Sequence, residues 1–171
     1  MDVLLLFLIL LLLIFALWIS SAFFGAPFQP TSDKALKQMV QIAGIKKNQR
    51  MADLGSGNGK IVIEFAKKGI ESHGFEINPV LALWSKIRIK KLGLQKKAFI
   101  HLGNFMNQDF SKLDLITSFQ INYIMPGLER KLQRELRKGA KVVSNTWKFP
   151  HWKPKRKLSY GLGNVYLYVK D

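Results

Sequence analysis

The sequence of 171 residues contains no cysteine, so disulfide bonds, thiolate metal sites and a cysteine nucleophile are all excluded. This absence fits a reducing compartment and excludes a disulfide-rich secreted module. The sequence also has no internal repeat and no low-complexity segment beyond an apolar N-terminal leader, which excludes repeat architectures. We predict no metal site.

Acidic residues are scarce. Lys and Arg number 27 against 11 Asp and Glu, which gives a net charge of +16. Asp2 is the only charged residue before Asp33, so the basic excess belongs to the rest of the chain. A positive field attracts nucleic acid and anionic lipid alike, so the sign of the charge does not select between these partners.

The N-terminal leader is apolar without interruption from Val3 to Ile19. With the residues up to Phe24 it predicts a helix long enough for a hydrocarbon core of roughly 30 Å, so we interpret residues 1–25 as a single-pass transmembrane anchor. Trp18, Phe23 and Phe24 would lie near the membrane interface. Positive charge begins only at Lys34, so the positive-inside rule places the N-terminus outside and the following domain on the cytoplasmic side.

A cleaved signal peptide is the alternative interpretation of this leader. The residues Ser20-Ser21-Ala22 would suit a cleavage site, but the basic n-region that precedes the apolar part of a signal peptide is missing. The transmembrane interpretation is therefore favoured.

A linker and one domain are predicted after the leader. Gly25, Pro27 and Pro30 break the first helix and make residues 26–33 a linker. Thr31 or Ser32 can cap a helix that ends at Gly44. Residues 34–171 are close to the commonest domain size, so we expect a single core.

Short apolar runs alternate with amphipathic stretches from Arg50 onward, a pattern typical of an α/β fold with a parallel sheet. The predicted strands are 51–54, 72–77, 98–102, 114–119, 140–145, 157–160 and 164–169, and the predicted helices between them are 60–68, 79–92 and 127–138. The last two strands flank Gly161-Leu162-Gly163, which predicts an antiparallel hairpin. The expected fold is a Rossmann-like, seven-stranded, mostly parallel sheet with helices on both faces, preceded by the transmembrane helix.

A glycine-rich loop, Asp53-Leu54-Gly55-Ser56-Gly57-Asn58-Gly59, joins the first predicted strand to a helix. Its glycines let backbone amides approach a ligand closely. The loop reads G-x-G-x-G after an acid, whereas a dinucleotide fingerprint reads G-x-G-x-x-G. Asp53 would repel a pyrophosphate but would attract S-adenosylmethionine (SAM), which carries a sulfonium and an amino group. A turn that merely joins strand and helix would not require three alternate glycines.

Two polar residues follow the next strands. Glu76 ends the second strand about twenty residues after the loop, where a carboxylate can accept hydrogen bonds from ribose hydroxyls. Asn104 follows the third strand, where its amide oxygen can accept from the amine of adenine. A solvated surface Glu and an ordinary turn Asn are the alternatives.

These residues resemble the class I, seven-β-strand methyltransferases, with residues 53–59 as motif I, Glu76 as the ribose-binding acid and Asn104 at the adenine side. The chain more closely resembles the membrane-anchored protein-lysine methyltransferases that modify the ATP synthase c-subunit and the adenine nucleotide translocase. This resemblance rests on the leader, on residues 27–31, 75–79 and 149–152, and on motif I. Asn58 and Asn104 stand where that family is expected to carry Asp.

The resemblance implies SAM as cofactor and methylation of lysine in a protein, expected to be membrane-associated. The implied cofactor-binding residues are Thr31, Asp53, Gly55, Ser56, Gly57, Asn58, Gly59, Glu76, Asn104 and Phe105.

The methyl acceptor is expected near the end of the fourth strand, where Gln120, Asn122 and Tyr123 are candidates to orient an amine. They are equally compatible with an ordinary loop before Pro126-Gly127. Trp147, His151 and Trp152 could line a lysine channel, although a His among aromatic residues is more often part of the packing. No general base is identified, and the basic run 153–157 could face anionic lipid.

Two alternatives to protein lysine methylation remain: a different methyl acceptor, and a domain without catalysis. A lipid headgroup amine or small molecule would need the same cofactor site. A tethered nucleic-acid-binding domain without catalysis would use the charge but would not need the glycine loop or Glu76, and aromatic residues for base stacking are sparse outside the C-terminal part. We therefore expect no specific nucleic-acid partner.

Overall fold

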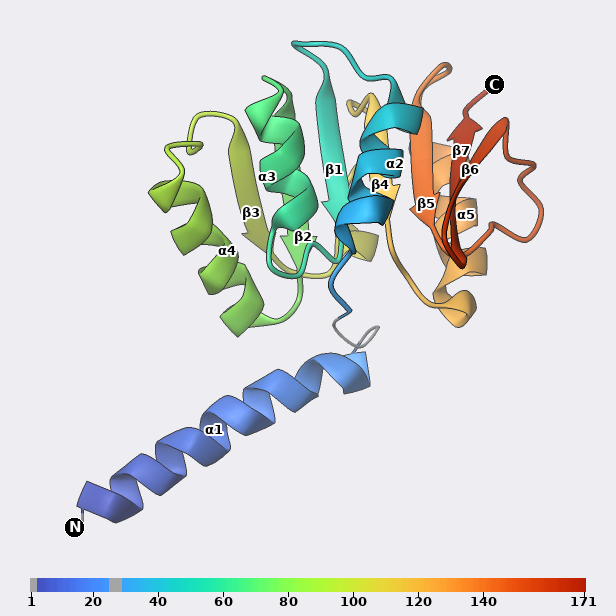
Figure 1. The fold of residues 1–171 in the computed structure, drawn as a ribbon. Helices are drawn as coiled ribbons and strands as arrows, with labels where there is room; N and C mark the ends of the chain where they lie inside the picture. Colours follow the sequence, from blue (N-terminus) through green and yellow to red (C-terminus); the bar gives the residue numbers. More distant parts are fainter. Residues whose placement is uncertain (1–2, 25–28) are drawn as a thin grey trace.

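A computed structural model describes residues 3–24 and 29–171, with side chains described for residues 3–16 and 29–171. Its centre is one seven-stranded sheet in the order β3-β2-β1-β4-β5-β7-β6 (Figure 1). The strands are β1 (Arg50–Leu54), β2 (Glu71–Glu76), β3 (Ala98–Leu102), β4 (Leu115–Ser118), β5 (Lys141–Asn145), β6 (Arg156–Tyr160) and β7 (Gly163–Val169). The predicted seven-stranded Rossmann-like sheet is confirmed.

Strands β1 to β5 pair in parallel, and β7 runs antiparallel to both β5 and β6. The C-terminal hairpin therefore joins the sheet through its second strand, with β7 beside β5 and β6 at the edge. The carboxyl ends of β1, β2 and β4 meet at one edge of the sheet, where parallel α/β folds bind their ligands.

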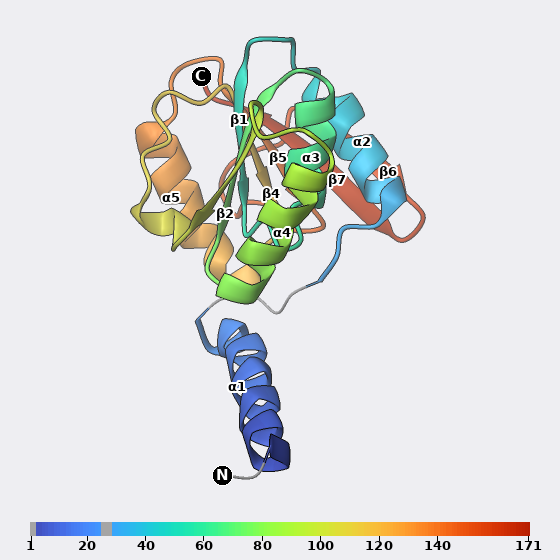
Figure 2. The same ribbon diagram turned by 90° about the vertical axis from the view of Figure 1, so that its left-hand side faces the viewer.

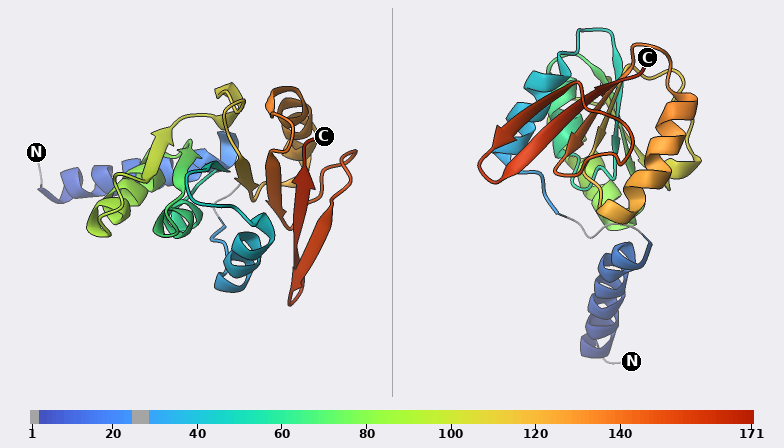
Figure 3. Two further views of the ribbon diagram at one scale, coloured as in Figure 1. Left: turned by 90° about the horizontal axis from the view of Figure 1, so that it is seen from above. Right: turned by 90° about the vertical axis from the view of Figure 1, so that its right-hand side faces the viewer.

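Three helices cover one face of the sheet: α2 (Asp33–Ala43), α3 (Lys60–Lys67) and α4 (Pro79–Lys91). On the other face lies α5 (Met125–Glu135), as the views from the side and from above show (Figures 2 and 3). Two short 3-10 helices, η1 (Phe105–Asn107) and η2 (Asn122–Ile124), follow β3 and β4.

Local signals explain where the helices begin and end. The Ser32 hydroxyl accepts a hydrogen bond from the Ala35 N–H at 3.2 Å, and Gly44 ends α2 in the left-handed conformation. The Asn78 side-chain oxygen accepts hydrogen bonds from the first N–H groups of α4, with Pro79 in the first turn. The capping prediction for Ser32 and Gly44 is confirmed.

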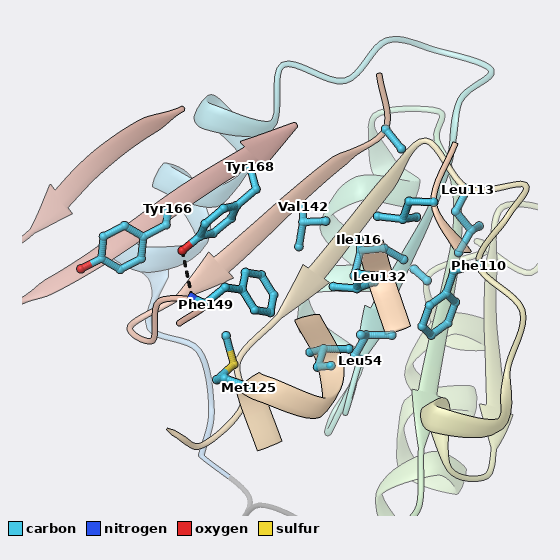
Figure 4. Packing of buried hydrophobic residues seen from close by; sticks show 14 of the residues in the cluster. Leu54, Phe110, Leu113, Ile116, Met125, Leu132, Val142, Phe149, Tyr166 and Tyr168 are labelled. Carbon is cyan, nitrogen blue, oxygen red and sulfur yellow. Dashed lines mark hydrogen bonds between the residues drawn. The ribbon is translucent and has the colours of Figure 1, made fainter. Parts of the chain in front are cut away.

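Apolar side chains fill both sides of the sheet. The α2 and α3 side contains Met39, Ile42, Met51, Phe65 and Leu115. The α5 side contains the residues drawn in Figure 4, among them Leu54, Ile116, Met125 and Leu132. There the N–H of Phe149 donates a hydrogen bond of 3.1 Å to the Tyr168 hydroxyl, which ties the segment after β5 to β7.

One predicted helix is displaced. We expected a helix over 127–138, and α5 instead spans Met125–Glu135. The pair Pro126-Gly127 suggested a break before the helix, but Pro126 fits the first turn, where its missing N–H would have no helical partner. The helix ends early because Leu136 takes an extended conformation that leads toward β5.

The leader forms helix α1 (Val3–Phe24), which lies beyond the carboxyl edge of the sheet (Figures 1 and 2). Within the described part of the chain no helix is both long and apolar enough to cross a membrane, so the predicted transmembrane helix is not supported. The predicted interfacial side chains of Trp18, Phe23 and Phe24, the cleavage site at residues 20–22, and Gly25 and Pro27 of the linker region lie outside the described residues or side chains.

Candidate active site

A cavity of about 460 Å³ opens at the carboxyl ends of β1, β2 and β4. Nine of the ten predicted cofactor residues line it: Thr31, Asp53, Gly55, Ser56, Gly57, Asn58, Glu76, Asn104 and Phe105. Gly59 is not among the lining residues. It is the capping residue that precedes α3, and it packs against Ser85. The structure thus gathers residues that are distant in sequence around one space, and their individual roles in binding remain predictions.

The glycine loop between β1 and α3 holds its shape through positive φ angles and backbone hydrogen bonds. Gly55, Gly57 and Gly59 have φ angles of 72°, 53° and 73°, which favour glycine. The N–H groups of Gly55 and Ser56 both donate to the Phe75 carbonyl, at 2.9 and 3.0 Å. The loop is therefore fixed against the end of β2.

Glu76 is buried at the end of β2 and is oriented by two backbone groups. Its Oε2 accepts from the Gly57 N–H at 2.7 Å, and its Oε1 accepts from the Asn78 N–H at 2.8 Å. Each carboxylate oxygen has a further lone pair, so the side chain can still accept hydrogen bonds from a pair of hydroxyls. This geometry suits the ribose of SAM.

Asp53 lies at the base of the cavity and is almost fully buried. Burial raises the pKa of the Asp53 carboxyl to about 7. The hydrogen bond from Thr117 opposes that rise, and the negative charge of Glu76 adds to it. Thr117 Oγ1 donates to Asp53 Oδ1 at 2.8 Å. A buried carboxylate with a raised pKa is stabilised by a cation, and the sulfonium and ammonium groups of SAM supply such charge.

Lys60, at the start of α3, is a site residue that the sequence analysis missed. Its ammonium donates to the Thr31 carbonyl at 2.7 Å and pairs with Asp33 at 2.8 Å. It therefore links the segment before α2, which contributes Gln29, Pro30 and Thr31 to the cavity wall, to the start of α3 beside the glycine loop.

The segments that follow β3 and β4 contribute a mostly apolar and aromatic part of the cavity lining. Besides the predicted cofactor residue Phe105, this part includes Met106, Phe119, Tyr123 and Ile124. Among the described lining residues the charged ones are Asp53 on β1, Glu76 at the end of β2 and Lys60 at the start of α3. The described lining contributed by the segments after β3 and β4 therefore has no charged side chain.

The three predicted amine-orienting residues differ in position. Gln120 lines the cavity but is buried, and its Nε2 donates to the Leu54 carbonyl at 2.6 Å, so its amide is engaged in holding the end of β1. Tyr123 lines the cavity mouth and is 72% exposed. Asn122 is exposed and does not line the cavity.

The predicted lysine channel is not formed by Trp147, His151 and Trp152, since none of them lines the cavity. Trp152 packs against Phe149 and Tyr168, and the backbone N–H of His151 donates to buried Glu129. Asn104 lines the cavity as predicted, while its side-chain oxygen already accepts from the Met106 N–H at 2.8 Å and has one lone pair left for adenine.

A sheet of this order, a glycine loop after β1, a buried acid near the end of β1 and a carboxylate at the end of β2 together define a class I SAM-dependent methyltransferase. Residues 53–156 match the family described as the ANTKMT methyltransferase domain. The chain belongs to this family, and its methyl donor is SAM.

Curated relatives and a solved structure agree with this assignment. The chain is 34% identical over 149 residues to a protein-lysine N-methyltransferase of Saccharolobus islandicus (strain REY15A), covering 84% of this chain and 92% of that one. It is 33% identical over 142 residues to the Homo sapiens ATP synthase c-subunit lysine N-methyltransferase, covering 83% and 60%. A solved RNA methyltransferase from Salinibacter ruber in complex with S-adenosyl-L-homocysteine superposes with a TM-score of 0.80 at 26% identity, covering 82% and 93%.

The match covers only part of the length of the mammalian relatives. The chain spans between 57% and 65% of the human, rat and mouse ATP synthase c-subunit lysine N-methyltransferases.

Proposed function

We propose that this chain methylates the side-chain amine of lysine in a protein. The observation that carries the proposal is the cavity lining, in which the charged groups come from β1, β2 and α3 and the segments after β3 and β4 contribute mostly apolar and aromatic side chains. The protein-lysine N-methyltransferase relatives support the same acceptor, and their targets suggest a membrane protein such as the ATP synthase c-subunit or the adenine nucleotide translocase.

The apolar lining after β3 and β4 favours the reactive, neutral form of the acceptor amine. An unperturbed lysine has a pKa of about 10.4, so removal of its proton at neutral pH costs roughly 4 kcal/mol. Desolvation beside Met106 and Phe119 disfavours the ammonium and lowers this cost. SAM supplies a methyl group on a positive sulfur. The amine nitrogen gains the N–C bond as the S–C bond breaks, and the amine proton passes to water.

We also propose that α1 attaches the enzyme to a membrane, with the catalytic domain on the cytoplasmic side. Every large apolar side chain from Val3 to Phe15 is at least 44% exposed. Such a continuous apolar surface is unfavourable in water and suits a lipid environment. The basic residues that follow, from Lys34 onward, favour the side of the membrane with anionic lipid.

Label transfer tests the acceptor. The full chain is incubated with methyl-labelled SAM and membranes from its source, beside a Glu76→Ala variant and a Glu64→Ala control, whose carboxylate pairs with Lys68 on the surface of α3. We expect protease-sensitive label that yields methyl-lysine on hydrolysis. Glu76→Ala should lower transfer about tenfold or more, because a charge-assisted hydrogen bond is worth about 1.5 kcal/mol or more, while Glu64→Ala should retain it.

Other acceptors give different outcomes in the same experiment. RNA is a second candidate because the chain has a net charge of +16 and resembles the RNA methyltransferase of Salinibacter ruber. Glu76-dependent label that nuclease removes would establish RNA in place of lysine. Label confined to the lipid extract would establish a headgroup amine.

A further inference from the structure

Helix α4 carries apolar side chains on both of its faces. The inner face packs against α3 and β3 through Ala82 and Ile89. The outer face carries four residues at positions i, i+3, i+4 and i+7, which we call the α4 stripe. They are Val80, Leu83, Trp84 and Ile87, with 36%, 60%, 55% and 39% of their surface exposed. Contiguous exposed apolar residues of this kind mark a contact surface.

The surroundings of the α4 stripe are positively charged. Between Glu76 and Asp109 the sequence has no acidic residue and six basic ones: Lys86, Arg88, Lys90, Lys91, Lys96 and Lys97. Lys90 and Lys91 lie three and four residues after Ile87, so they continue the same face of the helix by one turn. Arg88 is partly engaged elsewhere, since it donates to the Asn58 carbonyl at 2.6 Å. An apolar stripe that ends in lysines complements an anionic, partly apolar surface.

The position of α4 relates this stripe to α1 and to the cavity. Helix α1 contacts α4, and α1 lies beyond the carboxyl edge of the sheet where α4 begins (Figures 1 and 2). Ile77, which precedes α4, and Leu81, in its first turn, line the cavity. The exposed apolar surface of α1 and the α4 stripe therefore belong to neighbouring elements beside the cavity.

We propose that the α4 stripe binds the headgroup region of an anionic lipid bilayer and forms a second membrane contact beside α1. This inference rests on the membrane attachment proposed above. Trp84 suits the membrane interface because its ring combines an apolar body with a polar N–H. Lys86, Lys90 and Lys91 lie within reach of anionic headgroups, which attract such residues near the surface. The contact would direct the cavity toward lysines that lie close to the bilayer.

The absence of cysteine allows a direct test on the full chain, because one introduced cysteine is a unique labelling site. A nitroxide is attached at Leu83→Cys on α4 or at the control Lys112→Cys, an exposed position that precedes β4, at the amino end of the parallel strands and away from the cavity. Its collision rates with lipid-soluble oxygen and with a water-soluble nickel chelate are measured. The vesicles contain phosphatidylcholine alone or an equal mixture with phosphatidylserine, and co-sedimentation reports binding of the whole protein.

We expect the label at position 83 to gain oxygen contact and lose nickel contact in the phosphatidylserine vesicles, while the label at 112 does not change. Changing Lys86, Lys90 and Lys91 to Gln should return the oxygen and nickel collision rates of the label at 83 toward those measured in neutral vesicles. SAM binding by each labelled variant checks that the site is intact.

Several results would overturn the proposal, and they are distinguishable. Protein that co-sediments while the label at 83 remains as accessible to nickel as in buffer would refute the α4 contact and leave the attachment through α1 intact. Protein that does not co-sediment would refute both. Protection of position 83 only when a membrane protein is added would assign the α4 stripe to protein docking, and equal protection at 112 would indicate non-specific adsorption.

Discussion

The backbone N–H of Gly57 donates a hydrogen bond of 2.7 Å to Oε2 of Glu76, which joins the glycine loop after β1 to the last residue of β2. The second oxygen of the same carboxylate accepts from the Asn78 N–H, so it also fixes the start of α4. A residue predicted as a ligand contact is thus equally a structural link between two segments of the cavity wall.

Glu76→Gln should damage both roles. An amide offers only one acceptor oxygen, so one of the two backbone N–H groups loses its partner. We expect a loss of about 1–3 kcal/mol in the free energy of unfolding and a SAM dissociation constant raised about tenfold or more. Denaturant titration and calorimetry measure the two effects. Glu64→Gln, on the exposed side of α3, is the matched control, and unchanged SAM affinity in Glu76→Gln would remove Glu76 from the binding site.

The pH dependence of SAM binding should report the Asp53 carboxyl. Its pKa is raised to about 7 by burial, so the ligand-free protein carries a proton there below that pH. A cationic ligand favours the carboxylate, so binding below pH 7 releases the proton. The association constant should rise about tenfold per pH unit up to pH 7 and then level off. Calorimetry in buffers of different ionisation enthalpy should detect the released proton, and a flat profile from pH 5.5 to 8 would contradict the assignment, as those limits bracket the pKa of about 7.

Asp53→Asn should separate stability from binding. The folded pKa of Asp53 lies above the ordinary value of 3.8, so its contribution to the stability of the ligand-free protein falls as the pH rises from about 4 to about 7. Removing the charge should therefore raise the melting temperature at pH 8, by about 2 °C or more, while weakening SAM binding. At pH 4 the two proteins should melt at similar temperatures. A lower melting temperature for Asp53→Asn at pH 8 would count against the buried charge as a destabilising group.

Gly55→Ala should strain the loop in two ways. The backbone φ of 72° is unfavourable for alanine, and the new Cβ would lie 2.8 Å from Nε2 of Gln120. Gln120 must then move and release the Leu54 carbonyl. Gly161→Ala is a matched control, because its φ is 59° and its Cβ would have no heavy atom within 4 Å. We expect Gly161→Ala to cost about 1 kcal/mol and Gly55→Ala about 1–3 kcal/mol more. Equal losses in thermal unfolding would show that the Gln120 contact is unimportant.

Lys60→Met should loosen the cavity wall while keeping the length of the side chain. The Thr31 carbonyl and Asp33 would both lose the ammonium, so the segment from Gln29 to Thr31 would be held less firmly. We expect SAM affinity to fall several-fold, with about 1 kcal/mol lost in stability. Lys68→Met, which removes only the surface pair with Glu64, should change neither by more than about 0.5 kcal/mol. Wild-type affinity in Lys60→Met would show that the wall does not depend on this lysine.

Sequence reasoning succeeded where the determining signal is local. Ser32 and Gly44 mark the ends of α2 through their own hydrogen bonds and conformations. The glycine loop and Glu76 are close in space because they follow neighbouring parallel strands, and the alternation of strands and helices already implies that neighbourhood. All seven predicted strands occur, with boundaries within one residue of the predicted ones.

Features that depend on distant partners were not predictable. Lys60 appeared to be an ordinary residue in the first turn of a helix, because its partner Thr31 lies 29 residues away. Gln120 appeared free to orient an amine, but it is engaged by Leu54, 66 residues earlier. Trp152 suggested a substrate channel, yet it packs against Tyr168 on β7. The place of β7 between β5 and β6 is decided only when the sheet is assembled.

The order of the strands leaves β3 and β6 at the two edges of the sheet. Edge strands present unpaired backbone groups that can template addition of a strand from another molecule. Lys96 and Lys97 directly precede β3, and β6 itself begins with Arg156 and Lys157. Mutual repulsion at these positions opposes strand addition between copies, so the protein should become more prone to aggregate at high ionic strength, where charge is screened. The basic excess that draws the enzyme toward anionic partners thus also keeps its own copies apart.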